Sequence, residues 1–489
     1  MSKQTDDFFK NIISHAKEYG FVFPSSEIYD GLSAVYDYGQ LGSELKNNLK
    51  TYWWKSMVQL NENIVGIDAA IFMHPTTWKA SGHVDGFNDP MIDNKDSKKR
   101  YRADQLIEDK IDRYEKDGKT EKAAQLQKDL DDALNADDLG RLKTIIEDHN
   151  IVCPISGTKN WTDVRQFNLM FATQMGAMAD GAEQVYLRPE TAQGIFVNFL
   201  NVQKTGRMKI PFGIAQIGKA FRNEVIARQF IMRMREFEQM ELQFFVRPGS
   251  ELAWYKQWKE TRLKWHLALG ADRTKYRFHD HVKLAHYANA AVDIEYEFPF
   301  GFKEVEGIHS RTDFDLKQHQ EFSGKKLQYF DPEINQSYIP YVIETSIGLD
   351  RLFLTVLANC LVQEDLSTEE KQDARVVLKF HPAIAPVKAA ILPLTKKDGL
   401  PEKAREIMAK LKLDYNIQYD EKDSIGKRYR RQDAIGTPFC VTVDHQTLED
   451  NTVTIRHRDS MQQERVNADN LEQIIGNLVS MSSLLKQLQ

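Results

Sequence analysis

The sequence predicts a globular protein of several domains that contains both strands and helices. With 489 residues the chain is too long for a single hydrophobic core, so two or three domains are expected. Its composition, 42% hydrophobic and 28% charged, is typical of soluble globular proteins. Residues 233–243 alternate at strand period, and residues 341–361 change from strand alternation to helical spacing after Gly348.

Composition also argues against several classes of protein. No apolar run approaches a membrane span, and the first twenty residues lack the apolar core of a signal peptide. Cys153, Cys360 and Cys440 lie far apart, which gives no disulfide framework and suits a reducing cytoplasm. The net charge of −6 argues against a protein that simply coats nucleic acid. We therefore expect a cytoplasmic protein with no membrane partner.

Shifts in charge divide the chain into regions. Residues 94–150 are strongly charged and helix-forming, which predicts a solvated helical insertion within a first domain made of residues 1–93 and 151–370. An acidic, polar linker then precedes residues 375–489, where 18 Lys and Arg against 15 Asp and Glu give a net charge of +3. This last region has alternating strand-like and helix-like segments and a basic run, "KRYRR", at 427–431.

The segment 220–245 concentrates arginines, carboxylates and aromatic residues. At strand period Arg233, Arg235, Phe237 and Glu241 share one face. Upstream, Arg222 and Glu224 also share a face. Two interpretations remain open at this point: a site that needs cations, a carboxylate and a ring together, or a surface hairpin of paired charges.

The segment 341–361 has the character of a strand that runs into a buried helix. Glu344 and Ser346 share a strand face, and after Gly348 the apolar residues recur at helical spacing as far as Cys360. Arg351 lies in the first helical turn, off the apolar stripe, where a positive charge opposes the helix dipole. A nucleotide bound through its phosphates or by ring stacking would account for this arginine.

These stretches resemble class II aminoacyl-tRNA synthetases, and the glycyl-tRNA synthetase family in particular. "FRNE" with "REFEQMELQFF" is similar to the second class signature, "ETSIGLDRL" to the third, and "LGSELKNNLKTYWWKSMVQ" with "IVGIDAAIFMHP" to the first. "WKASGHVDGFNDPM", "RQFNLMF" and "LRPETAQGIFVNF" are similar to segments specific for the glycyl family. The resemblance spans nearly the whole chain, and an ordered set of motifs is far more specific than one.

The resemblance implies an α+β catalytic domain built on a six-stranded antiparallel sheet flanked by helices, with a helical insertion and a C-terminal α/β anticodon-binding domain. It implies an enzyme that activates glycine with ATP and Mg²⁺ and transfers it to tRNA-Gly. It also implies a homodimer built on about residues 41–75, where Trp53, Trp54, Met57 and Val58 would form an apolar patch. The "KRYRR" loop is expected to be either a tRNA contact or a solvated turn.

The resemblance also implies a nucleotide site. Arg222 and Arg351 are the expected catalytic residues: Arg222 stabilises the charge that develops on the α-phosphoryl group, and Arg351 stacks on the adenine ring opposite Phe237. Glu304 is expected to hold magnesium, although Glu304 and Glu306 also fit a charged strand face. The full expected ATP set is Arg222, Asn223, Glu224, Met232, Arg233, Met234, Arg235, Glu236, Phe237, Glu304, Val305, Gly348, Leu349, Asp350 and Arg351.

For glycine, which has no side chain, selectivity must come from excluding larger residues and binding the ammonium. The family pattern places Glu190, Glu241 and Glu344 around the ammonium and Ser346 where a β-carbon would project. The full expected set is Arg102, Glu190, Phe237, Glu238, Gln239, Met240, Glu241, Glu344, Thr345, Ser346, Ile347 and Gly348.

The chain departs from the family at one point, and two other functions stay open. Many relatives carry Cys-x-x-Cys where this chain has Cys153 and Ser156, so no structural zinc is expected. One alternative is a class II synthetase for histidine, proline, threonine or serine. The other is a non-catalytic, RNA-binding paralogue, against which the presence of Arg222, Glu224 and Arg351 counts. No base for the transfer step is evident.

Overall fold

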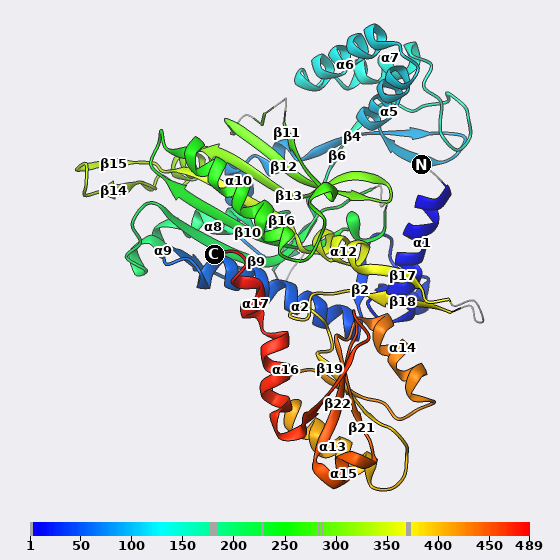
Figure 1. Ribbon diagram of the computed structural model, residues 1–489. Helices are drawn as coiled ribbons and strands as arrows, with labels where there is room; N and C mark the ends of the chain where they lie inside the picture. Colours follow the sequence, from blue (N-terminus) through cyan, green and yellow to red (C-terminus); the bar gives the residue numbers. More distant parts are fainter. Residues whose placement is uncertain (1–2, 177–182, 226–228, 282–283, 286, 368–372) are drawn as a thin grey trace.

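The computed structural model describes residues 3–176, 183–225, 229–281, 284–285, 287–367 and 373–489 (Figure 1). A seven-stranded sheet forms the centre of the first domain. Its strand order is β11 (Tyr276–Asp280), β12 (Ala290–Phe298), β13 (Gly301–Thr312), β16 (Tyr341–Gly348), β10 (Glu236–Val246), β9 (Phe212–Phe221) and β3 (Ile64–Gly66).

This sheet corrects the expectation of six antiparallel strands. The first six strands of the order are antiparallel to their neighbours, but β3 adds a seventh strand that runs parallel to β9. Ile64 pairs with Gly213 and Gly66 with Ala215. A three-residue strand is too short to give a periodic signal in the sequence. It occupies an edge where β9 would otherwise present unpaired backbone groups.

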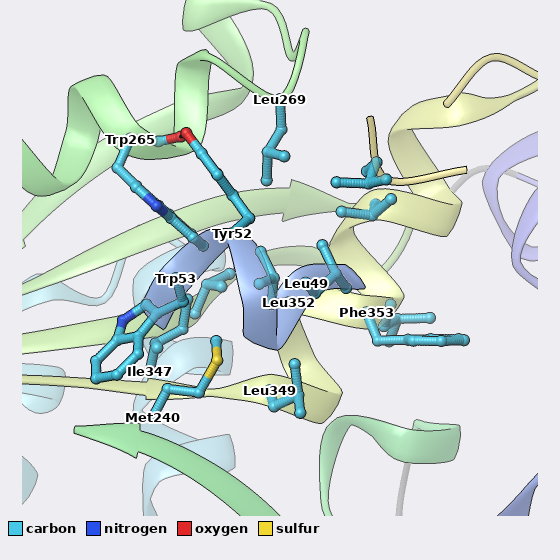
Figure 2. Close-up of a cluster of buried hydrophobic side chains, with 14 of the residues drawn as sticks. Leu49, Tyr52, Trp53, Met240, Trp265, Leu269, Ile347, Leu349, Leu352 and Phe353 are labelled. Atoms are coloured by element: carbon cyan, nitrogen blue, oxygen red, sulfur yellow. The ribbon is translucent and has the colours of Figure 1, made fainter. Parts of the chain in front are cut away.

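Three helices cover one face of the sheet: α2 (Gln40–Trp54), α10 (Glu251–Leu267) and α12 (Leu349–Cys360). The rings of Tyr52 and Trp265 stack with their centroids 4.7 Å apart. Figure 2 shows this pair, with Met240 and Ile347 of the strands lying beside Trp53 in the same cluster. Because neighbouring residues of a strand point to opposite faces, the polar residues between these strand positions point away from the core. Part of the other face is covered by a second cluster around α8 (Ala192–Val197) and α9 (Phe199–Thr205).

The helix expected to carry a dimerisation patch buries it instead. Trp53 and Met57 are 0% and 2% exposed in the chain's own core, and Trp54 and Val58 pack partly buried against it. The four residues therefore form no exposed apolar patch, which removes the reason given for a dimer contact there. The spacing of apolar residues is the same for a helix at a dimer interface and for a helix in the core of one chain, so the sequence alone did not distinguish these alternatives.

The insertion has a core of its own. Strands β4 (Asn88–Asn94), β5 (Lys99–Arg102) and β6 (Arg165–Asn168) form a small sheet that carries α5 (Ala103–Lys116), α6 (Thr120–Asn135) and α7 (Leu139–Asp148). Leucines and isoleucines of the three helices pack on Ile92 and Trp161. Cys153 is buried there, with its Sγ 3.2 Å from the Tyr101 hydroxyl.

The C-terminal region is a five-stranded sheet with helices. Its strand order is β20 (Ile417–Tyr419), β19 (Ala389–Pro393), β21 (Phe439–Val443), β22 (Thr452–His457) and β23 (Gln463–Asn467). Helices α13 (Leu400–Leu411) and α16 (Leu471–Val479) pack on it. Short helix α17 (Met481–Leu485) then returns the chain to the first domain beside α2.

The basic run "KRYRR" lies in helix α14 (Ile425–Ile435), so its prediction as a loop was wrong. Arg428 is buried and donates hydrogen bonds to the carbonyl oxygens of Pro393 and Leu394. Arg431 lies 2.7 Å from Asp420 and 2.8 Å from Asp423. The carbonyl oxygens and the two aspartates therefore already bind Arg428 and Arg431, two of the basic residues that the sequence offered as possible tRNA contacts.

The two domains share a core. Leu378 and Phe380, together with Leu484 and Leu485 of α17, belong to the main hydrophobic cluster. Buried Asp433 pairs with Arg375 at 3.0 Å and with Arg456 at 2.8 Å. A chain truncated near residue 373 would expose this core, so truncation is a poor way to separate the domains. The predicted acidic linker falls partly on residues 368–372, outside the described residues.

In the part of the chain that the structure describes, no helix combines the length and apolar character that crossing a membrane requires.

Candidate active site

A cavity of about 230 Å³ opens on the sheet face opposite the main core, over β10, β13, β16 and the start of α12. The residues that line it come from segments far apart in the sequence. Of the predicted site residues, the lining includes Glu190, Arg222, Glu224, Met232, Arg233, Met234, Phe237, Gln239, Glu241, Glu304, Glu344, Ser346, Gly348, Asp350 and Arg351.

A second group of predicted residues does not reach the cavity, because the strands alternate. Met240, Ile347, Leu349 and Val305 are at most 1% exposed and pack in the main core. Thr345 is fully buried between Glu344 and Ser346 on β16. Side chains at these positions support the pocket from below and do not face its interior.

A third group of predicted residues does not line the cavity, and its members are held by other partners. Arg102 pairs with Asp104 at 2.5 Å and Asp89 at 3.3 Å. Arg235 donates to the carbonyl oxygens of Glu224 and Ser33, and the backbone N–H of Asn223 donates to Leu169. Glu236 pairs with Lys219, and Glu238 lies 2.6 Å from Lys46.

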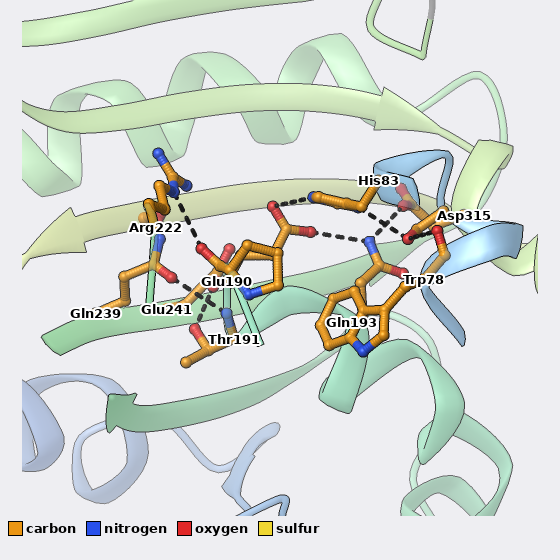
Figure 3. A network of polar contacts seen from close by, with 12 residues as sticks. Trp78, His83, Glu190, Thr191, Gln193, Arg222, Gln239, Glu241 and Asp315 are labelled. Carbon is orange, nitrogen blue, oxygen red and sulfur yellow. Dashed lines mark hydrogen bonds and ion pairs between the residues drawn. The ribbon is translucent and has the colours of Figure 1, made fainter. Parts of the chain in front are cut away.

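Two carboxylates enter the cavity at the end nearest α8 (Figure 3). Glu190 lies 3.4 Å from Nε2 of His83 and accepts a hydrogen bond of 3.0 Å from Gln193. Glu241 accepts hydrogen bonds from the hydroxyl of Thr191 and from Gln243. Each carboxylate therefore has a fixed position, set by side chains packed behind it.

A third carboxylate, Glu344, is anchored by Arg311. The guanidinium of Arg311 lies 2.5 Å from Glu344 and makes a bidentate contact with Asp315 at 2.8 and 3.0 Å. On the other side, Nδ1 of His309 lies 3.4 Å from Glu344. Arg311 is buried, and its paired carboxylates satisfy its charge.

The three carboxylates do not titrate alike. Burial raises the pKa of Glu241 well above its usual range, and the charges of Glu344 and Glu190 add to this rise. Burial acts in the same direction on Glu344, but Arg311 and His309 outweigh it and hold its pKa at about 2. His83 and Arg311 likewise outweigh burial and lower the pKa of Glu190. The surroundings therefore favour the neutral form of Glu241 and the ionised forms of Glu344 and Glu190, as the directions of their pKa shifts indicate.

Two arginines and an aromatic ring also line the cavity. Arg222 donates from Nε to the carbonyl oxygen of Pro189, and its guanidinium lies 5.4 and 5.3 Å from the ring centroids of Phe87 and Phe237. Arg351 pairs with Glu304 at 2.9 Å. Arg351 is also the main reason why the pKa of Glu304 is lowered.

The sequence analysis missed several residues at the site. His83, Tyr287, and the pair His309 and Arg311 on β13 contact or line the pocket from three separate places in the sequence. His83 lies in "WKASGHVDGFNDPM" and His309 in "GFKEVEGIHS", segments singled out for other residues. A strand-face reading of 301–312 would have grouped His309 and Arg311 with the pocket.

Family models match three successive parts of the chain. A family model described as "tRNA synthetase class II core domain (G, H, P, S and T)" matches residues 171–360. One described as "Glycyl-tRNA synthetase insertion domain 1" matches residues 89–125 and 118–169, and one described as "Anticodon binding domain" matches residues 388–478.

Curated relatives cover nearly all of the chain. The glycine–tRNA ligase of Chlorobaculum tepidum is 57% identical over 93% of this chain and 97% of its own length. The enzymes of that name from Staphylococcus haemolyticus and Staphylococcus aureus are 53% and 54% identical, each over 96% of this chain and over 99% and 98% of their own lengths. The chain therefore belongs to the glycine–tRNA ligase family, with a class II synthetase core, an insertion domain and a C-terminal anticodon-binding domain.

Proposed function

We propose that the protein catalyses the reaction of glycine with ATP in this cavity, which gives glycyl-adenylate and pyrophosphate. It then transfers the glycyl group to the 3′ end of tRNA-Gly. The observation that carries this proposal is the set of side chains that line the cavity: three anchored carboxylates together with Arg222, Phe237 and Arg351. The carboxylates fit the ammonium group of a zwitterion, and the arginines with the ring fit a nucleotide. The relatives, all named for glycine, support this choice over a synthetase for another amino acid.

Most of the rate enhancement is expected to come from the positioning of glycine and ATP relative to each other. The carboxylate of glycine is already ionised, so it attacks the α-phosphorus without a general base, and the rate depends on alignment. Negative charge then grows on the α-phosphoryl oxygens. Arg222 is held between two rings and tied to Pro189, so it meets that charge without reorganising.

Selection of glycine rests on what surrounds the ammonium. Glu190, Glu241 and Glu344 supply the charge that binds it. Ser346 lies on the same strand face as Glu344, and Gln239 donates to its hydroxyl at 3.4 Å. We propose that Ser346, so placed, excludes a β-carbon and hence any larger amino acid.

The arginines and the aromatic ring fit ATP with magnesium. Phe237 and Arg351 both line the cavity, and we propose that an adenine ring stacks between the π face of Phe237 and the guanidinium plane of Arg351. Bound magnesium would neutralise phosphate charge. Glu304 is the residue that would hold it, since its carboxylate is 46% exposed at the cavity wall and oxygen ligands suit this ion.

We also propose that the chain works as a cytoplasmic homodimer and that its C-terminal domain binds the anticodon of tRNA-Gly. Two-fold pairing is the commonest assembly of soluble enzymes. Phe72, 53% exposed, lies in the predicted dimer segment and offers apolar surface that the buried Trp53 does not. Light scattering should give about twice the 56.6 kDa of one chain. A fully active monomer would exclude the dimer as a requirement.

Glycine affinity should rise with pH. Below the raised pKa of Glu241 its carboxyl is neutral and attracts the ammonium weakly, so binding must release the proton. Affinity should therefore increase by up to about tenfold per pH unit until Glu241 is ionised in the free protein. Calorimetry from about pH 5 to about pH 8, in buffers of different ionisation enthalpy, measures the affinity for glycine and the number of protons released on binding.

A matched variant makes this test specific. Glu241→Gln keeps the shape of the side chain and its contact with Thr191 but cannot release a proton. It should bind glycine more weakly and with little pH dependence. Wild-type affinity that does not change with pH, with no proton release, would mean that no neutral carboxyl faces the ammonium.

The proposed function is tested by charging. The full chain with ATP, magnesium and labelled glycine should load a tRNA-Gly transcript and leave a tRNA-Ala transcript unloaded. Formation of adenylate without charging of tRNA-Gly would contradict the second step, and loading of tRNA-Ala would contradict the specificity.

A further inference from the structure

A cluster of two histidines and an aspartate lies beside the cavity, on the outer strands of the same sheet face. His279 on β11 pairs in register with Asp293 on β12, and Asp293 pairs with Gly307 on β13. Two residues beyond His279 and beyond Gly307, the same pairing continues. The backbone N–H of His281 donates to the carbonyl oxygen of Ala291, and Ala291 pairs in register with His309. Residues paired across strands share a face, so His281, Asp293 and His309 all point the same way.

Their side chains converge closely enough to share one ion. Among the described residues, these three form the one group of His, Cys, Asp or Glu whose candidate ligand atoms all lie within 4.8 Å of one another. Nε2 of His281 is 2.9 Å from the carboxylate of Asp293. Bound zinc takes His nitrogens and carboxylate oxygens at about 2.0–2.2 Å, so small side-chain rotations would bring all three into range.

The backbone leaves room for an ion at this place. Gly307 lies under the cluster, and a β-carbon there would come within 2.9 Å of Cε1 of His309 and 3.7 Å of Oδ1 of Asp293. Gly307 and His309 also line the active-site cavity. An ion bound by the three side chains would therefore lie at the cavity wall, with a coordination position open to water or to a phosphate oxygen.

The surroundings favour a cation held by oriented imidazoles. Nδ1 of His309 lies 3.4 Å from Glu344, and a carboxylate behind a ligating histidine fixes the ring and increases its basicity. The carboxylate of Glu304 adds a further negative charge near Asp293. A bound cation would relieve this crowding of negative groups.

We propose that His281, Asp293 and His309 bind a divalent transition-metal ion, with zinc as the best match, at the wall of the cavity. Imidazole ligands suit zinc and its neighbours, whereas magnesium prefers oxygen ligands alone. The site is distinct from the magnesium position at Glu304 and from the region of Cys153, where no structural zinc is expected. The sequence did not reveal it because His281 follows β11 while Asp293 and His309 lie on β12 and β13, with no short-range ligand spacing.

Metal titration of the full chain tests this site without any substrate. Protein stripped with a chelator is titrated with Zn²⁺ by calorimetry in excess Mg²⁺, and with Co²⁺ by its visible absorption. Wild type should bind one Zn²⁺ per chain, and His281→Gln should weaken binding by at least about tenfold. The matched control is His279→Gln, which removes a histidine two residues earlier in the chain, on β11, whose Nδ1 lies 3.2 Å from Glu295. This control should bind as wild type.

Equal Zn²⁺ affinity in wild type and His281→Gln would overturn the proposal, as would no binding by wild type tighter than about millimolar. Thermal unfolding of metal-free His281→Gln checks that the variant folds. If His281→Gln does not fold, the titration is repeated with Asp293→Asn, which removes the negative charge and keeps the shape of the side chain. The same loss of Zn²⁺ affinity is expected. Because no substrate is present, failure here would leave glycine activation untouched.

Discussion

Arg222→Gln should lower glycine-dependent ATP–pyrophosphate exchange by roughly a hundredfold or more, the loss typical of removing one preorganised charge contact. The guanidinium of Arg222 is fixed by Pro189 and by the rings of Phe87 and Phe237. Glutamine keeps a donor but loses the charge and the cation–π contacts. Because this charge matters most as the phosphoryl group becomes more negative, kcat should fall more than KM rises.

Arg277→Gln is the matched control for this variant. Arg277 lies on the same sheet over the ring of Phe302 and pairs with Glu295, but it does not line the cavity. Its loss should leave the exchange rate within about twofold of wild type. Wild-type exchange by Arg222→Gln would mean that residues 220–245 form only a surface hairpin of paired charges.

Glu306→Leu should destabilise the first domain by about 3–5 kcal/mol, the scale for breaking a buried ion pair on one side. Glu306 accepts from Arg262 at 2.5 Å and lies 2.8 Å from Nε2 of His266, and all three side chains are at most 1% exposed. Leucine fills the space but leaves the charge of Arg262 buried without its partner. Urea unfolding followed by tryptophan fluorescence measures the loss, since Trp265 stacks beside Arg262.

Glu304→Leu is the control for stability. It lies two residues earlier on the same strand, 46% exposed, and its pairing with Arg351 is on the solvent side. An exposed pair of this kind contributes about 0–1 kcal/mol. Equal losses for the two variants would contradict a buried network at Glu306.

Strand alternation explains how far the sequence predicted the site. On β10 the period correctly put Phe237, Gln239 and Glu241 on one face, and all three line the cavity. The same period puts Met240 in the core, although a contiguous motif had included it among the substrate contacts. A sequence motif indicates which segment forms the site, but the alternation of side chains along the strand sets which of its residues face the ligand.

Charge and distant contacts were harder to predict. Arg311 anchors Glu344, and His83 faces Glu190, but neither pair is joined by any local spacing. In α14, the carboxylate of Asp420 compensates Arg431 from 11 residues upstream. Contacts of this kind depend on tertiary packing, and a single sequence carries no pattern for them.

The most direct test of glycine activation is ATP–pyrophosphate exchange measured with each of the twenty amino acids, using the full chain and magnesium. Glycine alone should support rapid exchange if, as proposed, Glu190, Glu241 and Glu344 bind the ammonium and Ser346 excludes a β-carbon. Alanine and serine should be poor substrates. Exchange with alanine as fast as with glycine would contradict this account of the pocket.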